Sequence, residues 1–99
     1  MNIQALMRQA QNLQKDMMKT KKEIDEMEFN AESSFVSVKM NGKREVLKVT
    51  IKPDSDFNIE DMDLLEDMVQ VAVNDALKQI DNTTEKKMGK YTSAMPGLF

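Results

Sequence analysis

The stretch VSVKMNGKREVLKVTIKP, residues 36–53, contains two runs of alternating apolar and polar side chains on either side of an Asn-Gly pair. Alternation with a period of two is typical of a β-strand that buries one face, and Asn-Gly is a strong hairpin signal. Pro53 lacks a backbone N–H and ends the second run. The sequence therefore predicts an antiparallel hairpin at the centre of the chain.

The alternation leaves two registers open for this hairpin. A two-residue turn would set Val38 opposite Glu45, whereas a four-residue turn over residues 41–44 sets Val38 opposite Leu47. We prefer the four-residue turn because it pairs apolar with apolar side chains. Either register divides the second strand into an inward set, Leu47, Val49 and Ile51, and an outward set, Val46, Lys48, Thr50 and Lys52.

Before the hairpin, over about residues 2–28, apolar residues recur at alternating steps of three and four. This heptad pattern indicates a helix about 40 Å long that packs along one seam. The seam residues are Ile3, Leu6, Ala10, Leu13, Met17, Thr20, Ile24 and Met27. Thr20 alone is polar. Propensity does not stabilise so long a helix by itself, so the seam must meet another helix.

After the hairpin, a second helix is predicted over about residues 59–91. Asn58 is a candidate N-cap with Asp61 at the third helical position, and the neighbouring acids suit the positive end of the helix dipole. Its apolar stripe consists of Leu65, Met68, Val69, Ala72, Val73, Ala76 and Ile80, extended more weakly by Thr84, Met88 and Tyr91. Asn82 and Glu85 have capping-box spacing, which allows a kink or restart near Thr83.

A third, weaker strand is predicted over residues 28–33, so that strands occupy about residues 29–52, and residues 92–99 are expected to be irregular. The fold class is α+β, with one domain over residues 1–99. The second helix should cover the apolar face of the sheet. A sheet of two or three strands is marginal alone, which favours a dimer.

The composition of the chain excludes several functions. It has no Cys and no His, so disulfides, thiolate chemistry and the usual general base near neutral pH are absent. No nucleophile stands with a base, no Gly-rich loop could cradle a phosphate, and the acidic run over residues 54–67 lacks a calcium-loop pattern. We expect no enzyme activity, metal, cofactor or small-molecule substrate. No apolar run approaches a membrane span, and we expect a cytoplasmic protein.

The net charge of −3, from 14 basic and 17 acidic residues, hides a strong segregation. Residues 1–22 carry five basic residues and one acid, whereas residues 53–67 carry seven acids and no base. Four of the early cations fall on the helix side opposite the seam: Arg8, Lys15, Lys19 and Lys22. We call these four the basic ridge. This position keeps them away from the acidic start of the second helix.

The basic ridge predicts a contact with the phosphates of duplex DNA. The outward side of a heptad helix is solvated in any case and is often Lys or Arg, so the pattern alone is not specific. Two further basic groups are weaker candidates. One is near the C-terminus of the second helix: Lys86, Lys87 and Lys90. The other is on the outward sheet face with the turn: Lys39, Lys48, Lys52 and Arg44.

Several segments together resemble the YbaB/EbfC family of bacterial nucleoid-associated proteins. They are LMRQAQNLQKDM, the hairpin, EDMDLLEDMVQVAVNDAL, KKMGKYT and MPGLF. The resemblance implies a cytoplasmic, nucleoid-associated homodimer shaped like tweezers, with DNA contacts on its helical arms. Arg44 departs from the family pattern, since glycine is frequent at that point of the hairpin. The short tail after Met95 also departs from many relatives.

The function predicted from residues and resemblance together is non-enzymatic binding of duplex DNA by a homodimer, with a gene-regulatory or nucleoid-organising role. The predicted contacts are Arg8, Lys15, Lys19, Lys22, Lys86, Lys87 and Lys90. The alternative is a protein-binding module. It would be a prefoldin-like chaperone subunit, or an adaptor for DNA-repair or replication proteins that docks through the tail MPGLF.

Overall fold

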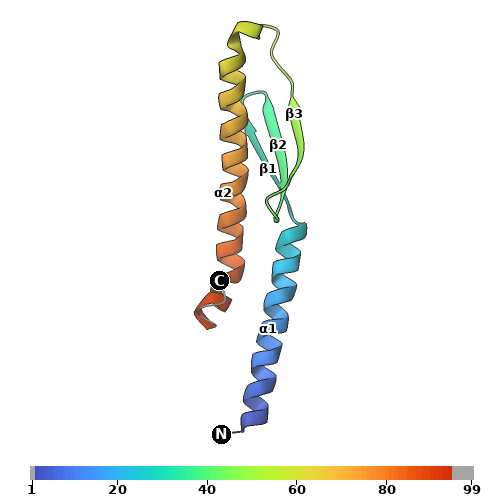
Figure 1. Cartoon of the computed structure of the whole chain (residues 1–99), viewed down its shortest axis with the longest axis vertical. Coiled ribbons are helices and arrows are strands. Elements are labelled where there is room, and N and C mark those ends of the chain that lie inside the picture. The colour runs from blue at the N-terminus through green and yellow to red at the C-terminus, as the bar shows by residue number, and fades with distance from the viewer. Residues whose placement is uncertain (1, 95–99) are drawn as a thin grey trace.

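A long helix, α2, runs along one face of a three-stranded antiparallel sheet, and a second long helix, α1, extends away from that sheet (Figure 1). The computed structural model describes residues 2–94. The strand order is β1-β2-β3, and the overall extents are 71 × 19 × 14 Å. The elements are α1 (Ile3–Glu26), β1 (Glu28–Ser33), β2 (Val36–Asn41), β3 (Val46–Ile51), the 3-10 turn η1 (Ile59–Asp61) and α2 (Met62–Ala94). The predicted α+β fold class and the third strand are confirmed.

Local side-chain chemistry explains where the helices begin and end. Asn2 caps α1 by accepting hydrogen bonds from the backbone N–H groups of Gln4 (3.0 Å) and Ala5 (3.4 Å). The helix ends at Glu26 because Met27 adopts an extended conformation (φ −68°, ψ 148°) and leads directly into β1. The predicted cap at Asn58 is confirmed as a full capping box, although it begins η1 rather than α2 itself.

Helix α2 is longer than the sequence pattern predicts. It runs without a break past Thr83 to Ala94, so the first three residues of the expected irregular tail are helical. The rest of that tail, residues 95–99, lies outside the described residues, and so does the candidate docking peptide MPGLF.

The register of the central hairpin differs from the preferred one. Val38 pairs with Val49 rather than with Leu47, and Met40 pairs with Val46. A β-bulge causes the shift, because Lys39 pairs with Lys48 and one extra residue of β3 stands between the two pairs. The inward set is therefore Val46, Val49 and Ile51, and the prediction that Val46 faces outward was wrong.

The turn of this hairpin is tighter than the four residues predicted. The Asn41 N–H donates to the Glu45 carbonyl (3.0 Å), which leaves three residues in the turn, and Arg44 there adopts φ 67°. The Asn41 side chain accepts from the N–H groups of Lys43 (2.9 Å) and Glu45 (3.1 Å). Gly42 is needed for a close approach: an added Cβ would lie 2.5 Å from the Ile24 carbonyl carbon.

The main hydrophobic core lies between α2 and the first two strands. Its buried residues are Phe29, Ala31, Val36, Val38, Met40, Met68, Ala72, Ala76 and Ile80. The predicted apolar stripe of the second helix is thus confirmed. By contrast, the inward side chains of β3 remain 44–48% exposed, although they share the sheet face that α2 covers at β1 and β2.

A second, smaller core joins α1 to the end of α2. Ile24, Met88 and Tyr91 are buried there, with Leu13, Met17 and Met27 packed against them. Thr20, the polar break in the seam, has its hydroxyl 3.3 Å from the Tyr91 hydroxyl, so the two groups hydrogen-bond. Within residues 2–94, the seam meets a helix only along this half. Ile3 and Leu6 are 71% and 45% exposed.

Candidate nucleic-acid interface

The basic ridge lies on the side of α1 opposite to the one that packs against α2. Leu13, Met17 and Ile24 form the packed side, against Met88 and Tyr91. The four ridge residues follow one another at intervals of 7, 4 and 3 residues. At about 100° per residue, these intervals confine them to a sector of about 60°. All four are exposed. The result is a row of four cations about 21 Å long, at about 1.5 Å per residue.

The ridge cations have no acidic partner within the part of the chain that the structure describes. Lys21, which lies off the ridge, does have one, since its Nζ lies 3.8 Å from Asp25 Oδ2. A phosphate can therefore approach the basic ridge without displacing an ion pair. That availability makes this side of α1 well suited to a polyanion.

The second predicted basic group remains separate from the basic ridge. Lys86, Lys87 and Lys90 are exposed on α2 and spread over about 100° of its circumference. Lys90 Nζ lies 5.0 Å from the centroid of the Tyr91 ring, within cation–π range. The ridge points away from α2, so the two groups do not form one continuous face of the chain.

The residues of the third predicted basic group do not all lie together in the structure. Lys39 and Lys48 stand directly opposite each other on the sheet face turned away from α2. Arg44 is not among them, because its guanidinium forms an ion pair with Asp81 of α2. This ion pair joins the hairpin turn to a residue of α2 that is distant from it in the sequence.

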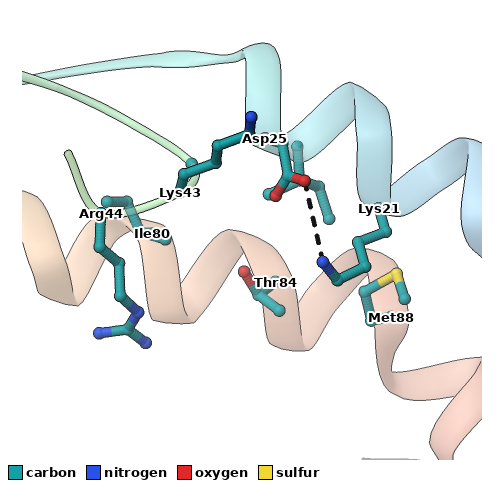
Figure 2. A pocket seen from close by; sticks show the side chains of 9 residues that line it. Lys21, Asp25, Lys43, Arg44, Ile80, Thr84 and Met88 are labelled. Carbon is teal, nitrogen blue, oxygen red and sulfur yellow. Dashed lines mark ion pairs between the residues drawn. The ribbon is translucent and has the colours of Figure 1, made fainter.

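The structure also contains a cleft that the sequence did not predict, between α1, the hairpin turn and α2 (Figure 2). It has a volume of about 450 Å³ and is lined by Lys21, Ile24, Asp25, Gly42, Lys43, Arg44, Ile80, Thr84 and Met88. Most of its charged groups are already engaged, through the Lys21–Asp25 and Arg44–Asp81 pairs. The cleft unites residues from three distant parts of the chain, and no local pattern reveals it.

The described residues contain neither a membrane-spanning helix nor a cluster of metal-ligating side chains. Among residues 2–94, no helix is both long enough and apolar enough to cross a bilayer. Nor does the described part of the chain gather three acidic side chains where they could hold a metal ion together.

Comparison with known proteins identifies the family. The family model described as the YbaB/EbfC DNA-binding family matches residues 1–95. The chain belongs to the YbaB/EbfC DNA-binding family. YbaB/EbfC-like relatives named nucleoid-associated protein occur in Clostridium novyi (43% identical, over 100% of this chain and 90% of the relative) and in Lactococcus lactis subsp. lactis (45%, over 97% and 98%).

The fold of this YbaB/EbfC family member is also found in a solved structure. A crystal structure of an uncharacterized protein from Helicobacter pylori superposes with a TM-score of 0.70 at 20% identity. The match covers 87% of this chain and 91% of the other. At that identity the likeness establishes the shared fold alone.

Proposed function

We propose that this chain is a non-enzymatic nucleoid-associated protein of the bacterial cytoplasm that binds duplex DNA as a homodimer. The basic ridge supplies the main contacts, which go to phosphates rather than to base edges. Lys86, Lys87 and Lys90 add contacts from α2. Phosphate contacts carry little sequence information, so selectivity is low. The cellular role is nucleoid organisation or gene regulation.

One observation carries this proposal: the basic ridge presents four exposed cations in a row, with no acid engaging them among the described residues. A net charge of −3 does not prevent DNA binding, because seven of the 17 acids lie in residues 53–67, away from the basic ridge. The acidic run of residues 53–67 leads into the start of α2, at the opposite end of the long axis from the start of α1 (Figure 1). At physiological salt, charges more than about 8 Å apart in solvent are largely screened from one another.

The homodimer is supported by apolar surface that the single chain leaves exposed. Val46, Val49 and Ile51 stand on the sheet face that α2 covers only at β1 and β2. Leu64 and Val71 on α2 are also exposed, by 53% and 55%. A second copy that covers these side chains removes the apolar surface from water, at roughly 25 cal/mol per Å². Two copies then bring eight ridge cations to DNA.

A salt titration of binding to random-sequence duplex DNA tests the proposal. The logarithm of the association constant falls with the logarithm of salt concentration by about 0.9 per phosphate neutralised. Replacing Lys15 and Lys19 by Gln removes four cations from the dimer, and should make this slope shallower by up to about 3.6.

The matched control loses the same charge elsewhere. Lys21→Gln with Lys78→Gln removes four cations off the ridge, so the slope should stay close to that of the unsubstituted protein. Equal slopes for the two double variants, with both proteins dimeric, would show that the basic ridge is not the contact surface.

A further inference from the structure

The open face of the sheet, turned away from α2, places two lysines in direct opposition. Lys39 of β2 and Lys48 of β3 are paired residues, so their Cβ atoms lie about 5 Å apart. Like charges in this position destabilise a sheet. A lysine on an edge strand discourages pairing with another chain, which explains Lys48 because β3 is an edge strand. Lys39 lies on the central strand, so this reason does not apply to it.

Polar groups surround this lysine pair in a shallow hollow of about 200 Å³. It is lined by Asn30, Ser37, Val38, Lys39, Lys48 and Thr50, and we call it the sheet hollow. The hydroxyls of Ser37 and Thr50, themselves on paired residues, form no hydrogen bond with any other described side chain or backbone group. Each hydroxyl is therefore free to donate to a ligand.

The acidic residues of the open face neutralise only part of the positive charge of its lysines. Glu28 Oε2 lies 3.6 Å from Lys39 Nζ, and Glu32 of β1 is paired with Ser37. Lys48 on β3 and Lys52 directly after it have no ion-pair partner among the described residues. Three lysines against two acids leave the open face with a net positive charge, and Lys39 and Lys48 form the pair next to the two hydroxyls.

We propose that the sheet hollow binds a phosphate group of the DNA backbone, with Lys39 and Lys48 as its cations and Ser37 and Thr50 as its hydroxyl donors. Lysine, serine and threonine are common phosphate ligands in protein–DNA interfaces. The bound anion neutralises the repulsion between the two lysines. This inference rests on the proposed function and extends the DNA footprint from the helical arm to the sheet.

The test compares Lys48→Gln with Lys78→Gln, two single losses of an exposed lysine, in the full-length protein. Salt titration with duplex DNA should give a slope shallower by about 1.8 per dimer for Lys48→Gln, and an unchanged slope for Lys78→Gln. Because Lys48→Gln also removes the like-charge pair, its Tm should rise by about 1–8 °C. If Lys48→Gln makes the protein more stable and yet weakens DNA binding, the weaker binding comes from a lost DNA contact and not from a damaged fold.

Two results would overturn the inference. If Lys48→Gln leaves the slope unchanged while the basic-ridge variant lowers it, the sheet hollow is not a DNA contact and the proposed function stands. If the unsubstituted protein shows no DNA binding, the proposed function and this inference fail together.

A further arm of the experiment distinguishes DNA phosphate from free phosphate. Millimolar inorganic phosphate is added while the amide resonances of Ser37 and Thr50 are followed by NMR. Shifts of both resonances, absent in Lys48→Gln, together with the shallower DNA slope, support the site. Such shifts with an unchanged DNA slope would assign the sheet hollow to free phosphate and overturn the DNA assignment.

Discussion

Replacing Gly42 by Ala tests the close packing of the hairpin turn against the backbone of α1. The added Cβ would lie 2.5 Å from the Ile24 carbonyl carbon and 2.9 Å from the Asp25 Cα, and closer still to the Ile24 carbonyl oxygen. Carbon atoms pack best at about 3.5–4.0 Å, so the turn must withdraw by at least about 1 Å. The neighbours are backbone atoms, which cannot rotate away.

Overpacking of this kind costs about 1–3 kcal/mol. For a domain of about 100 residues, 1 kcal/mol corresponds to about 4–8 °C in Tm. We therefore expect Gly42→Ala to lower Tm by about 4–24 °C. The assay is thermal unfolding followed by circular dichroism, at one fixed protein concentration because the Tm of the proposed dimer depends on that concentration.

Gly89→Ala is the matched control, and we expect the opposite sign. A Cβ at Gly89 meets nothing within 4 Å, and the residue lies inside α2. Alanine is favoured over glycine in a helix by about 1 kcal/mol, so Tm should rise by about 4–8 °C. A Gly42→Ala protein as stable as the unsubstituted one would refute the close approach of turn and helix.

Three further tests probe other contacts. Tyr91→Phe removes the hydrogen bond to Thr20 and should lower the free energy of unfolding by about 0.5–1.5 kcal/mol in urea denaturation; no loss would mean that the bond contributes nothing. Val49→Asp should convert the proposed dimer to a monomer in sedimentation equilibrium, while Thr50→Asp, on the opposite face of the same strand, should leave it dimeric. A dimeric Val49→Asp protein would exclude this face as the interface. Arg44→Gly should be more stable than Arg44→Ala by about 1 kcal/mol in the same urea assay, because both lose the ion pair and only alanine keeps the strain of φ 67°; equal stabilities would contradict the strain.

Periodicity predicted most of the fold because it reports which side of an element is buried. The stripe from Leu65 to Ile80 and the alternation of Val36, Val38 and Met40 both mark core residues. Periodicity does not predict which element packs against the buried side of a helix. The seam of α1 shows that a helix must meet it, but its packing against Met88 of the same chain depends on the tertiary arrangement.

The register of the hairpin could not be predicted, because apolar pairing fits more than one alignment. The bulge beside Lys48 and the side-chain bonds of Asn41 together set it. The register decides whether the sheet hollow contains a pair of lysines. The predicted four-residue turn would set Lys39 opposite Val46, so the lysine pair of the sheet hollow emerges only from the true register. The basic ridge, which depends on helical spacing within one element, was predictable.

Lysine acetylation footprinting with and without duplex DNA tests the central claim most directly. At low salt, mass spectrometry reports how far bound DNA slows the acetylation of each lysine. We expect protection at Lys15, Lys19 and Lys22 of the basic ridge, and none at Lys21 or Lys78. Equal protection of all five lysines, or protection of Lys21 and Lys78 alone, would contradict a DNA contact through the outward side of α1.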